Sequence, residues 1–462
     1  ARACYDRILP HVLSLCYHKM GLPITDCIWL AKALVNMRYH ILTGHGPSQN
    51  VSKSDENNQL FGIGQGATDA SAGWLIISTF LSQVYDKLAQ GCHMLSPDKK
   101  HALHWSHIMF VDDANLIHST TAHDATVNEL RNLVQKEVTM WNDGLHTTGG
   151  YLNGNKSKFY ILNWLFQKDG TPYLDPTIDT KTPVTISHQN TIEHIHQITP
   201  DFDKNEYKHL GVRTPASLRD TYELKHILKK GKKISKFLTA FPVTKLEAWT
   251  AYNMFFVPSY MYSAVTLSLN DRDTTKIHRT FVPTLLPKLG YQTTFPRAAV
   301  FAPQNIGGIG IVPFNVIITQ QKIKFLYRHL RKNTEIGKSI IINFKWAMLQ
   351  AGRRNAIFTS DNRIDYIENS WVIHLHNALK RMTGKLLIRD ITGEQLQRAN
   401  DSFLMDVWDK QNLPIAALYK LNLCRLYLRV SKLSNIASND GKHIQYDFLF
   451  GTRINTYTNL EW

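Results

Sequence analysis

The sequence predicts an α+β fold in which an antiparallel sheet backed by helices is followed by an α-helical part. Three observations support this fold class. Helical and strand patterns alternate up to about residue 215, a strand–turn–strand pattern surrounds Phe110-Val111-Asp112-Asp113, and helical patterns dominate from residue 217 onward. A shift in composition near residue 215 marks a boundary. We therefore expect one domain over 1–215, a helical segment over 216–330 and a C-terminal helical region of unknown role over 331–462.

The first domain is expected to begin with two helices, over 7–20 and 24–42, which Gly21-Leu22-Pro23 separates. A polar loop over 44–59 then leads into a strand. The elements expected next are a glycine turn at 62–66, an apolar helix over 71–90, the hairpin, an amphipathic helix over 124–146, and short strands and turns over 149–212.

The bulk composition is that of a basic globular protein. Of 462 residues, 43% are hydrophobic, which argues against wholesale disorder. The net charge of +16 favours a polyanionic partner, because each neutralised phosphate releases counterions. Five cysteines without a Cys-x-x-Cys indicate neither a disulfide framework nor a zinc knuckle, so we expect a reducing, intracellular compartment. The sequence has no apolar run near 20 residues and no secretory signal, so no membrane partner is expected.

The acidic hairpin is the most informative feature of the chain. Ile108-Met109 and Leu116-Ile117 would form its strands, with Asp112 and Asp113 at its tip. Adjacent carboxylates repel each other, and hard divalent cations such as Mg²⁺ remove this repulsion. Two such ions about 4 Å apart are a standard device for phosphoryl and nucleotidyl transfer. The alternative is a solvated Asp-Asp turn without a ligand.

Gly64-Gln65-Gly66 would open the helix over 71–90. Glycines allow a backbone to approach a ligand closely, and a helix N-terminus favours phosphate. A plain strand-to-helix turn is the alternative interpretation.

A set of lysines provides an independent indication of nucleic-acid binding. Lys225, Lys229, Lys232 and Lys236 are spaced by four, three and four residues, which places them on one helix face. Four lysines on one face favour an anionic partner, and a duplex backbone suits them. The alternative is a solvated helix face.

The histidines at 101, 104 and 107 are assigned a structural role, since no complementary Cys or His set lies nearby.

Several short motifs follow one another in a characteristic order. They are Tyr5-Asp6, the Gly64-Gln65-Gly66 turn, Phe110-Val111-Asp112-Asp113, Asn153-Gly154-Asn155-Lys156 and His209-Leu210-Gly211-Val212, followed by Leu286-Pro287, Phe295-Pro296-Arg297 and Gly307-Gly308-Ile309-Gly310. In this order and spacing, over roughly residues 1–330, they resemble the palm and thumb of reverse transcriptases. The resemblance is strongest to the branch of non-LTR retrotransposons and group II introns.

The resemblance implies an RNA-directed DNA polymerase, a nucleotidyltransferase that extends a DNA primer on an RNA template. It implies two Mg²⁺ ions, or Mn²⁺ in their place, held by the catalytic residues Asp112 and Asp113. The residues expected to contact the incoming dNTP are Tyr5, Gln65, Gly66 and Lys156, and Leu210-Gly211 would form the primer-grip turn. The partners would be the RNA template, the DNA primer and their hybrid. In a eukaryotic retroelement the protein would act in the nucleus.

The alignment of Tyr5-Asp6 with the first motif of the family leads to a further expectation. In the family this motif is Asp, four residues, an aromatic residue and Asp, and Tyr5-Asp6 match its last two positions. The catalytic Asp would then stand directly before Ala1, with the fingers further upstream, so we expect no primer extension from the chain as given. The sequence also departs from the family at Ala70-Ser71, where Ser-Pro is usual. The alternative function is a catalytically inactive nucleic-acid-binding scaffold derived from such a polymerase, and nothing in the sequence indicates an obligate protein partner.

Overall fold

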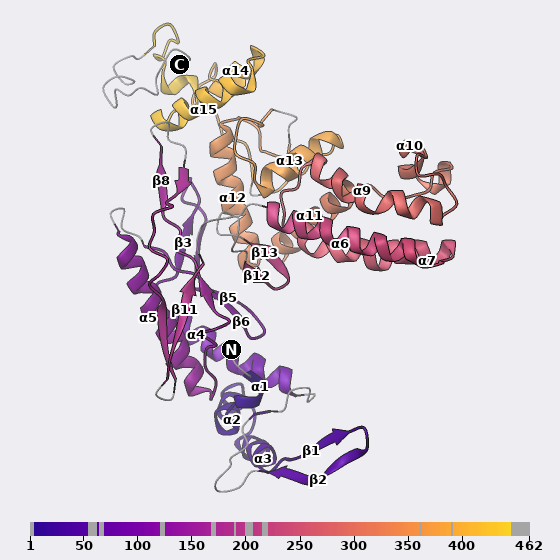
Figure 1. Cartoon of the computed structure of the whole chain (residues 1–462). Helices are drawn as coiled ribbons and strands as arrows, with labels where there is room; N and C mark the ends of the chain where they lie inside the picture. Colours follow the sequence, from indigo (N-terminus) through magenta and orange to yellow (C-terminus); the bar gives the residue numbers. More distant parts are fainter. Residues whose placement is uncertain are drawn as a thin grey trace. The chain divides into compact units, whose positions relative to one another are not determined.

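The computed structural model describes residues 4–53, 62–63, 69–120, 125–167, 172–188, 191–198, 207–214, 220–359, 363–389 and 391–444 (Figure 1). The protein is a mixed α+β protein, rich in helix and with small sheets, which confirms the predicted fold class at this level. The chain forms two compact units. Unit 1 comprises Ala1–His93, His104–Asn163 and Asp175–Thr199, and unit 2 comprises Met94–Leu103, Trp164–Leu174 and Pro200–Trp462. The assignment of 1–215 and 216–330 to palm and thumb stays a prediction, because compactness does not identify a role.

Unit 1 contains the elements that surround the acidic hairpin. Its helices are α1 (Cys4–Arg7), α2 (Pro10–Lys19), α3 (Ile24–Val35), α4 (Ala70–Leu88) and α5 (Val127–Thr147), and its strands are β1 (Arg38–Thr43), β2 (Gly46–Lys53), β5 (His107–Phe110), β6 (Asp113–Leu116), β7 (Lys158–Phe159), β10 (Val184–His188) and β11 (Thr191–Gln197). The chain passes between the units through β3 (Cys92–Leu95) and β4 (Ala102–Trp105). The helices predicted over 71–90 and 124–146 correspond to α4 and α5.

The main core of unit 1 forms around α4. This helix buries one apolar face against α2, α5 and the β5–β6 hairpin, as its helical spacing of apolar residues predicts. The core residues from α4 and α5 are Trp74, Ile77, Leu81, Tyr85, Trp141 and Leu145. A capping box between Thr126 and Glu129 begins α5 and satisfies two of its free N-terminal amides. The other face of α5 packs against β10 and β11 through Val134 and Val138.

Two sequence predictions for unit 1 differ from the structure. The helix expected over 24–42 ends at Val35, and Arg38–Thr43 pairs instead with Gly46–Lys53 as an antiparallel hairpin. Tyr39, Ile41 and Thr43 favour strand, and the turn at 44–45 allows the chain to fold back. The single antiparallel sheet expected is also not found among the described residues, where β5–β6 and β10–β11–β7 are separate small sheets and β7 runs parallel to β11.

Unit 2 is mainly helical, as the patterns after residue 217 predict. Its strands are β8 (Trp164–Phe166), β9 (Pro172–Leu174), β12 (Tyr207–His209) and β13 (Val212–Thr214). Its helices are α6 (Thr221–Ala240), α7 (Lys245–Thr250), α8 (Val257–Ala264), α9 (Asp271–Lys288), α10 (Arg297–Phe301), α11 (Phe314–Arg331), α12 (Glu335–Ala351), α13 (Trp371–Arg381), α14 (Leu404–Lys410) and α15 (Ile415–Leu428). A π-helical segment, η1 (Ala251–Phe256), joins α7 to α8, and the 3₁₀ turns are η2 (Gln304–Ile306) and η3 (Leu433–Asn435).

In unit 2, α9 packs against both α6 and α7 (Figure 1). The contacts of Gly231 with Thr280, Ser235 with Thr284, and Phe241 with Lys288 advance in the same direction, so α6 and α9 run parallel. A Cβ on Gly231 would lie 2.4 Å from the Thr280 hydroxyl oxygen, so the two helices approach this closely only because residue 231 is glycine. The core between them is rich in aromatic residues, including Tyr252, Phe256, Tyr260 and Phe281.

A second core of unit 2 joins α11, α12 and α13. The buried side chain of Arg425 then holds α15 to the end of α12, donating from Nη2 to the carbonyls of Leu349 and Gln350 at 2.9 and 2.8 Å. The region 331–462, predicted to be helical, is helical over α12 to α15. No described contact indicates its role.

Candidate functional site

The acidic hairpin predicted from the sequence is present in unit 1. β5 and β6 pair antiparallel, with Phe110 opposite Asp113 and Met109 opposite Ala114. Val111 and Asp112 therefore form a two-residue turn, and Asp113 is the first residue of β6. Asp112 is half-buried and Asp113 is exposed. The structure thus places two consecutive carboxylates at the tip of the hairpin, and their catalytic role stays a prediction.

The turn of this hairpin is strained. Val111 has a φ of +55°, a left-handed conformation that a β-branched residue adopts at a cost of about 1–3 kcal/mol. Such a conformation persists only where its surroundings impose it. Here the buried Trp74 of α4 donates from Nε1 to the Val111 carbonyl oxygen at 2.8 Å. The position of the two carboxylates is therefore set by α4 and not by turn propensity alone.

The two faces of the hairpin differ in character. Met109 and Ala114 pack against the core around α4. On the opposite face, Ile108 and Phe110 are 44% and 62% exposed, and Asp113 shares their side because side chains alternate along a strand. A carboxylate and an exposed aromatic ring therefore lie together on a surface that this unit does not cover with its own core.

Hydrogen bonds fix the other end of the hairpin. His107 lies between two hydroxyls, with Nε2 2.8 Å from Ser82 Oγ and Nδ1 2.8 Å from Ser106 Oγ. Burial lowers the pKa of His107, while the nearby Asp86 acts in the opposite direction. The imidazole is therefore neutral at pH 7. These contacts agree with a structural role for this histidine, and His104 likewise contacts the Gln90 carbonyl oxygen at 3.0 Å.

A buried carboxylate beside the hairpin is also fully engaged. Glu137 of α5 accepts hydrogen bonds from the Gln90 amide, the Tyr85 hydroxyl and His118. Burial alone would raise the pKa of Glu137, but the hydrogen bonds from His118 and Gln90 outweigh burial and lower it. Burial and the adjacent Glu137 raise the pKa of Tyr85. This network joins α4 to α5 beneath the hairpin.

Tyr5 and the acidic turn share one neighbour. Tyr5, in α1, is half-buried, and its ring lies 6.3 Å from that of Trp74. The ring of Trp74 therefore lies beside Tyr5, which is predicted to contact the incoming dNTP, while its N–H contacts the Asp112 turn. The structure brings these two predicted site features together through Trp74.

The structure says less about the other residues that are predicted to contact the nucleotide. Gln65 and Gly66 lie outside the described residues. Lys156 is exposed in a turn over 154–156, where its amide contacts Asn153 and the preceding Gly154 amide donates to Glu193 at 2.8 Å. Its predicted role toward triphosphate stays a prediction.

The predicted primer-grip segment is a hairpin turn in unit 2. His209 pairs with Val212, so Leu210 and Gly211 form the turn, with φ angles of +46° and +90°. The amide of Arg213 donates to the buried carboxylate of Glu223 in α6 at 3.0 Å, which anchors the hairpin to that helix. The structure therefore joins the predicted primer-grip turn directly to the helix that carries the four predicted lysines.

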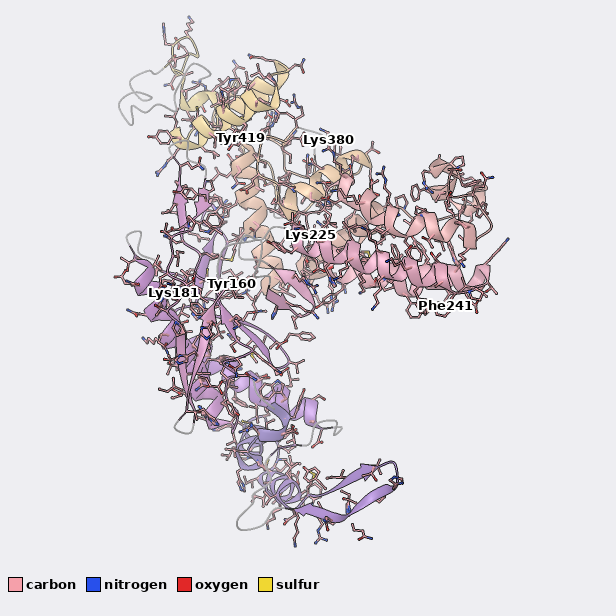
Figure 2. All side chains as sticks on the ribbon, in the orientation of Figure 1. Tyr160, Lys181, Lys225, Phe241, Lys380 and Tyr419 are labelled. Carbon is pink, nitrogen blue, oxygen red and sulfur yellow. The ribbon has the colours of Figure 1, made fainter. Side chains whose placement is uncertain are left out.

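All four predicted lysines of α6 are exposed. The helix buries Tyr222, Glu223, Ile227, Gly231 and Leu238 and leaves the lysines at 225, 229, 232 and 236 on its outer side. Figure 2 labels Lys225 near the start of this helix and Phe241 at its end. We call the four side chains the lysine face.

Sequence analysis missed the exposed aromatic residues beside the lysine face. Phe237 is 65% exposed, and its ring lies 4.4 Å from that of Phe241. Phe255 and Tyr262 are also largely exposed, on η1 and α8. Aromatic rings next to lysines suit a nucleic acid, because bases stack on rings while phosphates contact the cations. The spacing of Phe237 and Phe241 by four residues, directly after Lys236, is the signal that could have identified them.

Comparison with known families and with curated proteins finds no match for this chain. Within the described residues, no group of three or more His, Cys, Asp or Glu side chains is arranged to hold a metal ion. Of the helices in the described ranges, none is both long enough and apolar enough to cross a membrane.

Proposed function

We propose that this chain carries the nucleotidyl-transfer centre of an RNA-directed DNA polymerase of the non-LTR retrotransposon or group II intron type. The observation that carries the proposal is the acidic hairpin turn, in which Trp74 holds Val111 in a strained conformation next to two carboxylates. Backbone strain of this kind concentrates at functional sites. A merely solvated Asp-Asp turn would need neither the strain nor the buried indole.

The two carboxylates suit a hard cation. Asp112 and Asp113 offer the oxygen ligands that Mg²⁺ prefers, and the bound ion would stabilise the charge that develops on the transferred phosphate. Tyr5 would limit the space beside the sugar, and the exposed face of Ile108 and Phe110 would contact the primer terminus.

The catalytic half of the proposal is tested by primer extension. An RNA template, a DNA primer, dNTPs and Mg²⁺ are supplied to the chain as given and to a chain preceded by upstream residues that include the expected Asp. We expect extension only from the longer chain. Asp112→Asn should abolish it, while template binding is kept.

The matched control is Asp143→Asn, which removes an exposed carboxylate of α5 away from the hairpin tip. Undiminished extension by the Asp112→Asn protein would rule out the metal-ligand assignment.

The binding half of the proposal concerns the lysine face and needs no metal. If the four lysines contact a duplex backbone, each contact releases about one counterion, so the log–log salt slope for an RNA–DNA hybrid should fall in magnitude by about one per lysine replaced. Replacing all four by Ala should lower it by up to about four and reduce affinity for all sequences alike. The measurement is hybrid affinity across a salt titration.

A control with the same change in net charge replaces Lys324, Lys332, Lys410 and Lys442, which are exposed outside α6. It should lower the slope much less. If both quadruple variants behave alike, the lysine face is only a solvated surface.

A second candidate function is a nucleic-acid-binding scaffold without catalysis. The lysine face and the exposed rings of Phe237 and Phe241 favour it, because they belong to unit 2 and do not depend on the hairpin carboxylates. Hybrid binding that requires the lysine face, together with no extension from the longer chain, would identify the scaffold.

A further inference from the structure

Unit 2 contains a cavity that neither the hairpin nor the lysine face explains. Its volume is about 300 Å³, at the lower end of the range for small-molecule sites. One wall is the first three turns of α9, from Asp271 to Pro283, and the others are Arg297 and Phe301 of α10 with Pro313 and Asn315 at the start of α11. This size admits one small molecule or one nucleotide but not a duplex.

A buried donor without a partner lines this cavity. His278 is only 9% exposed, and the Phe314 amide donates to its Nε2, so Nε2 carries no proton. Burial, with Arg297 nearby, lowers the pKa of His278 to about 4, so the neutral ring carries its proton on Nδ1. Nδ1 is buried and has no hydrogen-bond partner among the described residues. An unsatisfied buried donor destabilises the protein, and a ligand acceptor would remove that cost.

The half-exposed carboxylate of Asp271 also lines the cavity. Asp271 pairs through Oδ2 with Arg381 at 2.8 Å, but its Oδ1 is buried without a partner among the described residues. The matching ligand group is a hydroxyl or an amine. Residues of the lining therefore hold an unmet donor and an unmet acceptor, and a ligand with both kinds of group would satisfy them after a small side-chain movement that exposes these atoms.

The remaining lining separates into a cationic and an apolar part. Arg279 and Arg297 are exposed at the cavity, and their guanidinium groups suit a phosphate or carboxylate. Val282, Pro283, Phe301 and Pro313 supply an apolar wall on which a planar ring can pack.

We propose that this cavity binds a single nucleotide, with its phosphate at Arg279 and Arg297, its base against the apolar wall and a hydroxyl donating to Asp271. The nucleotide is either free or an unpaired residue of a single strand, since both present the same groups. A nucleotide supplies the phosphate, the base and the hydroxyl together. Inorganic phosphate lacks the base and the sugar hydroxyl, and a nucleoside lacks the phosphate. The proposal rests on the lining alone and stands independently of the polymerase function.

The test is calorimetric titration of the full chain with adenosine 5′-monophosphate, adenosine, inorganic phosphate and a single-stranded tetraadenylate. We expect saturable binding of the monophosphate or the tetranucleotide and much weaker binding of phosphate and adenosine. Tetranucleotide binding without monophosphate binding identifies a strand as the source, and the converse identifies free nucleotide. Both results support the site.

Variants locate the binding. Arg279 has no ion pair or hydrogen bond with the described residues, so Arg279→Gln should leave the fold intact and weaken binding about tenfold or more, the effect of losing a charge-assisted hydrogen bond. Arg272→Gln is the matched control, because Arg272 is exposed on the same helix and does not line the cavity. Nitrogen NMR of His278 should report a shift at Nδ1 on binding.

No saturable binding of either nucleotide probe would overturn the proposal, and so would equal weakening by the two arginine variants. Equal affinity for inorganic phosphate would also overturn it, because it would show a plain anion site. Asp112→Asn should not change nucleotide binding in this assay, so failure of the polymerase proposal and failure of this one are separate results.

Discussion

Two hairpins, one in each unit, make a two-residue turn from different residues. The β5–β6 turn is Val111-Asp112, with a positive φ only at Val111, while the β12–β13 turn is Leu210-Gly211, with positive φ at both residues. Both patterns belong to the turn types that match strand twist, but those types favour Gly, Asn or Asp where φ is positive. The second turn has a glycine at one such position, and the first has none.

The difference shows where each turn gets its shape. In the Leu210-Gly211 turn, one of the two positions with a positive φ is a glycine, which adopts this conformation without strain. Glu223 anchors the strand that follows the turn. The acidic turn is strained and depends on Trp74, which contacts the turn itself. We infer that the acidic turn is imposed by tertiary contacts, while the glycine turn is largely local. Substitutions at the anchors and at the turns can separate these two cases.

Removing Trp74 should have the largest effect. Trp74→Ala deletes a buried aromatic side chain and the hydrogen bond to Val111, which should destabilise unit 1 by about 3–5 kcal/mol. Hydrogen exchange of the amides over 107–116 should rise accordingly. Trp74→Phe keeps a ring but loses the N–H, so it should cost less and still release the turn. Unchanged exchange in the hairpin of the Trp74→Phe protein would contradict the claim that the indole imposes the turn.

Removing the second anchor should have a smaller effect. Glu223→Ala leaves the Arg213 amide without its carboxylate acceptor and should cost about 2–3 kcal/mol in unit 2. Exchange of the Arg213 amide measures this directly. The turn at Leu210-Gly211 should keep its conformation, seen as unchanged chemical shifts there, and Glu335→Ala on an exposed surface serves as the control. Loss of the turn conformation would show that both hairpins depend on tertiary contacts.

The sequence predicts local features of this fold better than distant ones. The hairpin at Asp112-Asp113, helices α4 and α5, and the exposed positions of the lysine face follow from apolar periodicity and turn residues. The prediction of a helix over 24–42 was wrong because helical apolar spacing was extended past Val35, where the strand propensity of Tyr39, Ile41 and Thr43 and the pairing with β2 favour a strand. The hydrogen bond of Trp74 to Val111 joins residues 37 positions apart, and that of Phe314 to His278 joins residues 36 positions apart. The Nδ1 atom of His278 is notable because it has no partner among the described residues. Only packing reveals such features.

Relieving the strain at the acidic turn should raise stability. Val111→Gly removes a conformational cost of about 1–3 kcal/mol, while glycine loses about 0.5–1 kcal/mol more backbone entropy on folding, so a net gain of up to about 2.5 kcal/mol is expected. The Val111 side chain is 47% exposed, so little burial is lost. Urea unfolding of the variant and the parent measures the gain. If the polymerase proposal holds, the more flexible turn should also lower the rate of extension. A variant that is less stable than the parent would show that the turn is not strained.

The smallest expected effect is at the Leu210-Gly211 turn, where the substitution should lower stability and not raise it. Gly211 has a φ of +90°, which costs an L-residue about 1–2 kcal/mol, while alanine reduces the entropy of the unfolded chain by about 0.5–1 kcal/mol. Gly211→Ala should therefore destabilise unit 2 by up to about 1.5 kcal/mol. The effect isolates the backbone, because a Cβ at this position meets only Tyr262 Cε1, at an ordinary contact distance of 3.8 Å. Urea unfolding of the two turn variants side by side gives the comparison its sharpest form, since glycine should stabilise at position 111 and alanine should destabilise at position 211. Equal signs for the two substitutions would mean that at least one of the two turns is not strained or relaxed as its φ angles indicate.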